Sequence, residues 1–204
     1  MTTMTKPVTL PVVEPTWAIT QLFPMQGDWG EADYLALTEH TNRLIELVNG
    51  RLEVLPMPTR AHQRITKYLL LILEAIARRI GGEVHFAPLR VRIGPRHYRE
   101  PDLLLVCAAE DPRNQNDYWF GADLVVEIIS EGGYERDLVE KRREYAQVGI
   151  REYWIVDPLD ETISVLTLHG DKYAEHGRFT RGATATSALL ADLRVDVSAT
   201  FDAK

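Results

Sequence analysis

Two acidic residues in the middle of the chain stand beside or inside apolar runs. Asp102 directly precedes Leu103–Val106, and Glu127 lies within Leu124–Ile129. A charged side chain in an apolar run is costly unless it is paired or bound to a metal. Carboxylate oxygens suit Mg²⁺ or Mn²⁺, and such an ion can activate water and neutralise charge that develops on a phosphate. We therefore expect Asp102 and Glu127 to form the metal site of a nuclease.

A lysine follows on the next expected helix, residues 135–148. Asp137, Lys141 and Tyr145 fall four residues apart, so they share one face of that helix. Because the helix directly follows the strand that carries Glu127, one of its faces must cover the sheet near that carboxylate. If Lys141 faces inward, it can orient a metal-bound water or stabilise the transition state. The alternative is an ordinary surface ion pair with Asp137.

Other polar residues are weaker candidates for the same site. Glu46 is a candidate for a further carboxylate, although its alternation with apolar neighbours leaves its face of the strand open. His62 opens a long helix, where it could cap the helix, bind phosphate or have no role. Arg90, Arg92 and Arg99 belong to a basic segment that we expect to hold a nucleic-acid backbone.

Composition sets the class of protein. The chain has 204 residues, 45% hydrophobic and 26% charged, which is typical of a soluble globular domain with one substantial core. Its net charge of −7 is unusual for a nucleic-acid binder, although local basic groups matter more than the total. No apolar run is long enough to span a bilayer, and residues 1–13 do not resemble a signal peptide. The single cysteine, Cys107, extends an apolar strand, so we interpret it as a packing residue in a cytoplasmic protein.

Periodicity and turn residues predict alternating strands and helices after a proline-rich arm, residues 1–27. The expected helices are 31–40, capped by Asp28 or Gly30, then 61–80 and 135–148. The expected strands are 43–48 and 51–55 around Asn49-Gly50, 89–93, 98–106, 124–129, 152–156, 162–168, 172–175 and 193–197, and 111–121 reads as a polar loop. The order predicts one α/β domain over 28–204, with a mixed central sheet flanked by helices and an additional β-hairpin.

Several blocks of the chain, taken together, resemble the Uma2 family of restriction-endonuclease-like proteins. The resemblance covers residues 43 to 170 and rests on Glu46–Gly50, His62-Gln63, Pro101-Asp102, Asp123–Ser130, Asp137, Lys141, Tyr145, Gly149 and Glu152–Pro158. The blocks 123–130 and 152–158, in that order and spacing, are the specific part. The family has the PD-(D/E)xK nuclease fold, so the resemblance implies that fold here.

The resemblance also implies roles for individual residues. Asp102 and Glu127 would ligate the metal, with Glu46 as an additional acid and a backbone carbonyl near Ile128 as a further ligand. In the plain motif a lysine stands two positions after the second acid, where this chain has isoleucine, so Lys141 takes that role. A further departure is Glu131-Gly132-Gly133, where the family has a Ser-Pro-Ser-like turn. DNA would be the substrate, and a homodimer is expected because two cuts need two sites.

Two readings of other classes compete with the enzyme. The chain could be a non-catalytic module that keeps the fold and binds nucleic acid or a protein partner, which its acidic balance favours. Lys141 facing solvent would support that reading. The acids could also form a structural cation site, in which metal would raise the melting temperature without turnover.

Overall fold

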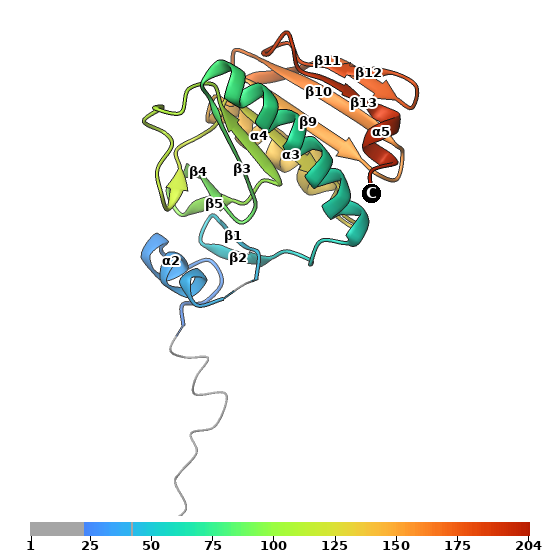
Figure 1. The fold of residues 1–204 in the computed structure, drawn as a ribbon. Helices are drawn as coiled ribbons and strands as arrows, with labels where there is room; N and C mark the ends of the chain where they lie inside the picture. The colour runs from blue at the N-terminus through green and yellow to red at the C-terminus, as the bar shows by residue number, and fades with distance from the viewer. Residues whose placement is uncertain (1–22, 42) are drawn as a thin grey trace, which may run out of the picture.

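The computed structural model describes residues 23–41 and 43–204, which form mixed sheets with helices packed on them (Figure 1). The helices are α2 (Glu31–Glu39), α3 (Arg60–Ile80), the π-helical turn η1 (Arg136–Glu140), α4 (Lys141–Gln147) and α5 (Val197–Phe201). The strands are β1 (Ile45–Val48), β2 (Arg51–Val54), β3 (Glu83–Phe86), β4 (Arg90–Gly94), β5 (His97–Arg99), β6 (Leu103–Val106), β7 (Tyr118–Trp119), β8 (Leu124–Ile128), β9 (Glu152–Asp157), β10 (Thr162–His169), β11 (Lys172–Thr180), β12 (Thr184–Thr186) and β13 (Arg194–Asp196).

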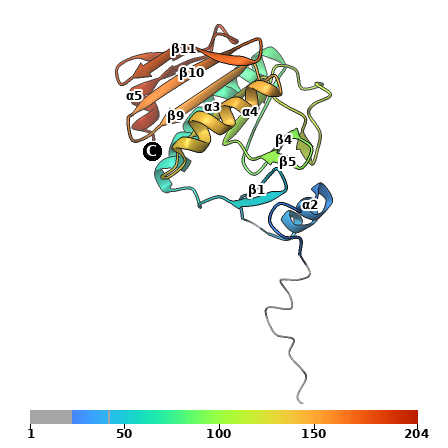
Figure 2. The ribbon, with the colours of Figure 1, turned by 180° about the vertical axis from the view of Figure 1, so that it is seen from behind.

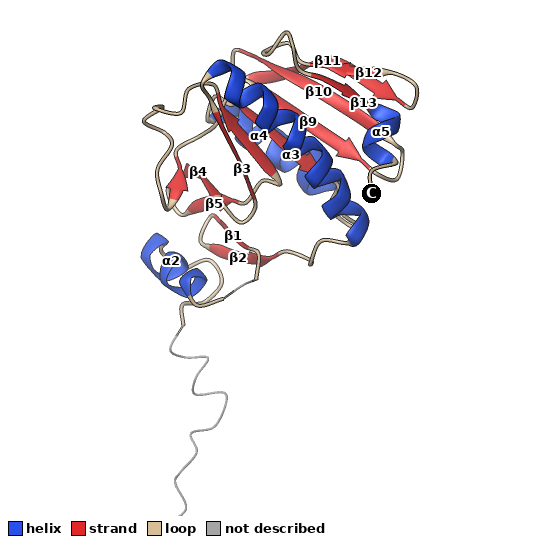
Figure 3. Ribbon diagram, in the orientation of Figure 1, coloured by secondary structure: helices blue, strands red, loops and turns tan. Residues whose placement is uncertain are grey.

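A six-stranded sheet forms the centre of the molecule (Figure 3). Its strand order is β11-β10-β9-β8-β6-β3, and β8 pairs in parallel with β9 while its other neighbour, β6, is antiparallel. Every residue of β6, β8 and β9 is buried, which explains their continuous apolar runs. The predicted mixed sheet is confirmed.

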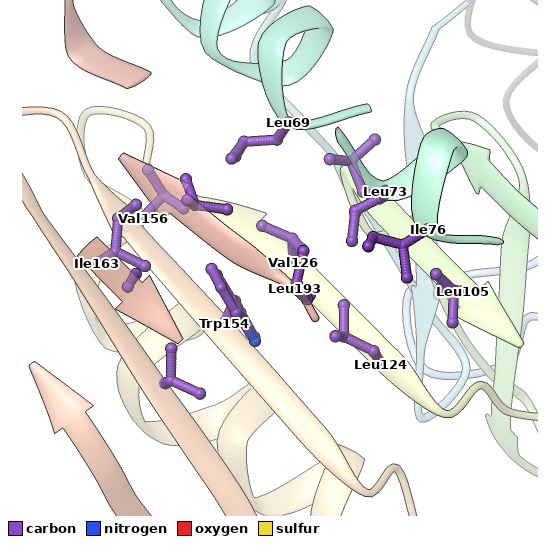
Figure 4. Close-up of a cluster of buried hydrophobic side chains, with 14 of the residues drawn as sticks. Leu69, Leu73, Ile76, Leu105, Leu124, Val126, Trp154, Val156, Ile163 and Leu193 are labelled. Carbon is purple, nitrogen blue, oxygen red and sulfur yellow. The ribbon is translucent and has the colours of Figure 1, made fainter. Parts of the chain in front are cut away.

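Helix α3 covers one face of this sheet. Its apolar residues recur at helical spacing, and Leu69, Leu73 and Ile76 pack with Leu105 and Val126 of the sheet (Figure 4). The Thr59 hydroxyl caps its first turn by accepting from the N–H of His62, and Gly81 ends it in the left-handed conformation at φ 74°. Both ends of the predicted helix are therefore close to those observed.

Helix α4 covers the opposite face, as the rear view shows (Figure 2). Tyr145 and Ala146 of α4 pack in one cluster with Val125 and Ile129. Since side chains alternate along a strand, Glu127 shares this face, while Leu124, Val126 and Ile128 belong to the α3 face. The helix and the strand thus place Glu127 under the first turn of α4.

A second sheet, of order β2-β1-β5-β4-β7, lies toward the N-terminal side of the molecule and packs against α2 (Figure 1). The predicted hairpin is confirmed, with positive φ at Asn49 (50°) and Gly50 (78°) in the turn between β1 and β2. Gly30 is the N-cap of α2, without a side-chain hydrogen bond, and Asp28 is not the cap.

Four predicted elements differ from the structure. The strand expected over 172–175 extends to Thr180 as β11. The strand expected over 98–106 is divided into β5 and β6, which belong to different sheets; Pro101 lies in the break, where it lacks the N–H that a ladder needs. The loop expected over 111–121 contains β7, which pairs in parallel with β4. The helix expected over 135–148 begins with the π-helical turn η1, in which the Lys141 N–H donates to the carbonyl of Arg136.

The remaining observations concern the N-terminal residues and the length of the helices. Of the predicted arm over 1–27, residues 1–22 lie outside the described residues, and Gln26 and Gly27 bond to the β1–β2 hairpin. In the described part of the chain, no helix is long and apolar enough to cross a membrane.

Candidate active site

Asp102 joins two strands of the central sheet at the entrance to β6. Its Oδ2 accepts the backbone N–H of Ile128 on β8 at 2.7 Å, and it contacts His62 Nε2 of α3 at 3.2 Å. The division of the predicted strand at Pro101 releases Asp102 from ladder pairing, so its carboxylate can turn toward β8. The side chain remains 18% exposed.

Glu127 is held under α4 by two hydrogen bonds to the same oxygen. Its Oε1 accepts from Lys141 Nζ at 2.8 Å and from the hydroxyl of Tyr145 at 2.6 Å. Burial raises the pKa of Glu127; Lys141 opposes this shift, and the nearby charges of Asp137 and Asp102 add to it. A divalent cation beside this carboxylate would favour its charged form.

Lys141 faces inward, toward three carboxylates. Besides Glu127, its Nζ lies 3.4 Å from Glu46 Oε1 and 3.5 Å from Asp137 Oδ1, and its side chain is only 2% exposed. Burial alone would lower the pKa of Lys141, but these carboxylates outweigh it and raise the pKa, so the ammonium is charged. The structure therefore places Lys141 at the acids and away from solvent.

Glu46 is fully buried and both of its oxygens are engaged. Oε2 accepts from Arg99 Nη1 at 2.7 Å, and Oε1 accepts the N–H of Glu100 at 3.0 Å and also faces Lys141. Burial opposes ionisation, yet Lys141 and Arg99 lower the pKa of Glu46 to about 2. Glu46 is thus arranged to hold Lys141 rather than to present a free oxygen.

Asp102 and Glu127 each keep one oxygen that accepts no hydrogen bond from the described residues. The bonds of Asp102 all involve Oδ2, and those of Glu127 all involve Oε1. Both residues line the same cleft, so two hard anionic oxygens remain for a cation, which fits Mg²⁺ or Mn²⁺. Within 23–41 and 43–204, no three His, Cys, Asp or Glu residues are grouped as a ready metal cage. Water or substrate oxygens would have to complete the coordination, as is usual for Mg²⁺.

The cleft has a volume of about 1100 Å³. Its walls come from the segment before α3, the first turns of α3, the end of β3, the end of β8 and the loop after β9; His62 on α3 is one of its lining residues. Burial alone would lower the pKa of His62, but its contact with Asp102 outweighs burial and raises it. Asp102 therefore favours the protonated form of His62 at this place in the cleft.

The expected basic segment is not a uniform nucleic-acid surface. The expectation for Arg99 is wrong, because its side chain is fully buried and binds Glu46 and Glu144. Arg92 is 28% exposed and pairs with Glu31 at 2.8 Å. Arg90 is 17% exposed and lies over the ring of Tyr34. Arg92 and Arg99 already bind carboxylates within the protein, which reduces what they can offer to phosphates.

Sequence reasoning missed Arg136. Its side chain lies 3.4 Å from Asp137 and, with Lys141, lines the cleft. In a regular α-helix, residues five apart do not share a face, so helical periodicity gave no reason to connect Arg136 with Lys141. The π-helical turn η1 joins these two residues by a backbone hydrogen bond. No residue pattern in the sequence indicates a π-helical turn at this position.

Comparison with known proteins identifies the family and the fold of this chain. The Uma2 family model, described as "Putative restriction endonuclease", matches residues 31–198. A solved structure from Anabaena variabilis ATCC 29413, described as a putative nuclease belonging to DUF820, matches with a TM-score of 0.69 at 19% identity, over 88% of this chain and 98% of that one. No match was found among curated proteins. The fold is that of the restriction-endonuclease-like proteins, and the chain belongs to the Uma2 family.

Proposed function

We propose that this chain is a metal-dependent endonuclease that hydrolyses phosphodiester bonds of DNA. The observation that carries the proposal is the pair of acids Asp102 and Glu127 in a cleft where Lys141 is buried against Glu127. Each acid has one oxygen that accepts no hydrogen bond within residues 23–41 and 43–204. The membership of a family described as restriction endonucleases supports the same reaction class.

Asp102 and Glu127 would hold Mg²⁺ or Mn²⁺, with the carbonyl of Ile128 as a further ligand. When bound, such an ion supplies an activated water and neutralises charge on the phosphate. The hydrogen bonds from Ile128 N–H to Asp102, and from Tyr145 to Glu127, fix the direction of each carboxylate before the ion arrives.

Lys141 would stabilise the negative charge that develops during hydrolysis. Its ammonium has three protons and faces Glu127, Glu46 and Asp137, so it is held in place by buried partners. Such preorganised donors need no rearrangement during the reaction. Glu46, itself fixed by Arg99, acts as a positioning residue for this lysine.

The test is cleavage of supercoiled plasmid with Mg²⁺ or Mn²⁺ by the wild type and by matched variants. Glu127→Gln and Asp102→Asn keep side-chain shape and should reduce cleavage at least about 100-fold, as expected when a group that stabilises the transition state is lost. Glu131→Gln is the control, because Glu131 lines the same cleft but is exposed. Retained metal-dependent cleavage in both site variants would exclude this site.

A non-catalytic nucleic-acid-binding module is the second candidate. The observation that favours it is that the Lys141 ammonium is already paired with Glu127, Glu46 and Asp137, although its inward orientation is the one expected of the enzyme. This reading predicts DNA binding that Glu127→Gln leaves unchanged, together with no cleavage by the wild type under any of the metals.

A further inference from the structure

A small cavity adjoins the cleft. Its volume is about 200 Å³, and its lining residues are Thr38, Thr41, Arg43, Pro88, Arg90 and Glu100. Pro88 and Glu100 line the cleft as well, so the two hollows share a wall. Ligand pockets for drug-sized molecules usually occupy roughly 300–1,000 Å³. The small cavity therefore suits a single ring system rather than a whole nucleotide chain.

Two buried polar atoms of residues that line this cavity have no hydrogen-bond partner among the described residues. They are Glu100 Oε2, on a side chain that is 2% exposed, and Arg90 Nε. Arg90 Nε lies 3.7 Å from the other oxygen of Glu100, which is beyond hydrogen-bonding distance. Buried polar atoms nearly always have partners. An acceptor and a donor left free side by side point to a ligand that presents a donor beside an acceptor.

An exposed aromatic ring lines the cleft near Asp102. Phe86 ends β3, is 53% exposed and pairs in register with Leu103, the residue after Asp102. The backbone N–H of the following residue, Ala87, donates to the carbonyl of Asp102 at 3.3 Å. An aromatic ring in this place can stack on a base next to the phosphate that the acids would attack.

The charge of the cleft disfavours a purely phosphate-based mode of binding. Its lining includes six acids against three lysines and arginines: Glu100, Asp102, Glu127, Glu131, Asp137 and Asp157 against Lys67, Arg136 and Lys141. Proteins that bind duplex DNA gain much of their affinity by neutralising phosphates with basic side chains. In this cleft, contacts to bases would have to supply a larger share of the affinity.

We propose that the cleft takes single-stranded DNA and that the small cavity binds one unpaired base. Glu100 Oε2 accepts an N–H of the base edge, Arg90 Nε donates to a ring nitrogen or carbonyl beside it, and Phe86 stacks on the neighbouring base. A base within a duplex cannot do this, because its edge is already paired and its faces are stacked. This inference names the substrate form for the proposed nuclease and rests on that function for its cleavage step only.

The first test measures binding by fluorescence anisotropy, with a labelled single-stranded DNA oligonucleotide and with the same strand in a duplex. Ca²⁺ serves as an oxygen-ligated cation in both measurements. The single strand should bind at least about tenfold more tightly than the duplex, and Phe86→Ala should weaken single-strand binding by about tenfold. Phe120→Ala is the control: Phe120 is 48% exposed, similar to Phe86, but does not line the cleft, and its loss should change nothing.

The second test separates base-edge recognition from stacking. With oligo-dA, oligo-dC, oligo-dG and oligo-dT, Glu100→Gln should change the order of affinities, whereas Phe86→Ala should weaken all four together. Arg90→Gln provides the same test if Glu100→Gln does not fold, as judged by thermal unfolding. Equal binding of single strand and duplex, an unaffected Phe86→Ala, or an unchanged order of affinities would overturn the inference.

The outcomes also separate this inference from the proposed reaction. If no metal supports cleavage but single strands bind with these dependences, hydrolysis fails and base binding stands. If duplex DNA is bound and cut as well as single strands, the base site fails and the nuclease stands.

Discussion

Replacing Arg99 with methionine removes the centre of a buried ion-pair network beside the candidate site. The Arg99 side chain is 0% exposed; its Nε and Nη2 donate to the Glu144 carboxylate at 2.8 and 3.0 Å, and its Nη1 donates to Glu46 at 2.7 Å. Methionine retains most of the length of the side chain without its charge. The variant therefore leaves two buried carboxylates without the guanidinium that donates hydrogen bonds to both of them.

The burial of these charged groups determines how much folding stability Arg99→Met should lose. Removing one partner of a buried ion pair costs about 3–5 kcal/mol. In a protein of 204 residues, each kcal/mol lowers the melting temperature by about 2–4 °C, so we expect a decrease of about 6–20 °C. Arg92→Met is the matched control: its single pair with Glu31 joins side chains that are 28% and 31% exposed, and should be worth less than about 1 kcal/mol.

Thermal and urea unfolding without DNA measure this difference. A second variant, Arg99→Met combined with Glu144→Leu, should recover part of the loss, because an apolar pair replaces an unpaired buried charge. If Arg99→Met melts like the wild type and only weakens DNA binding, the structural interpretation is wrong and Arg99 contacts the substrate.

The remaining predictions concern metal, pH, a helix cap and assembly. Mg²⁺ at about 100 times its Kd should stabilise the wild type by about 2.7 kcal/mol but not Asp102→Asn; stabilisation without plasmid cleavage would indicate a structural cation site. Burial alone would raise the pKa of Glu144, but His97 and Arg99 lower it from 4.5 to about 2. The ionised Glu144 therefore stabilises the fold fully above pH 4.5, and this stabilisation is lost as the pH falls toward 2. In Glu144→Gln, the free energy of unfolding should depend less on pH in that range. Thr59→Ala should cost about 1 kcal/mol in urea unfolding, since Thr59 caps α3. Sedimentation velocity should show a homodimer, and a species of 23.2 kDa at all concentrations would contradict it.

Much of the fold followed from local patterns. The Asn49-Gly50 turn, the helical spacing from Ile65 to Ile76, and the continuous apolar runs of β6 and β8 each specify one element through short-range sterics and burial. The division of 98–106 between two sheets was not predicted, because only the pairing partners of β5 and β6 show that the chain passes from one sheet to the other at Pro101.

Partners across the fold decide the arrangement around the acids. Chain order alone associated Glu127 with Lys141, since a helix that follows a buried strand must cover it. The sequence could not show that Arg99 is the buried partner of Glu46 and Glu144, because they come from three separate elements and exposed arginines have the same spacing. It also could not show that one atom of Arg90 and one of Glu100 have no hydrogen-bond partner among the described residues.

The amino-acid sequence by itself determined the family and most of the order of elements, and it indicated the candidate acids, because residue type, apolar runs and turn residues act over short distances. The tertiary structure decided which side chains meet, which of them retain free oxygens, and how the cleft is shaped. Those properties depend on contacts between residues far apart in the chain, where burial and charge pairing set whether an ionisable group is available to a substrate.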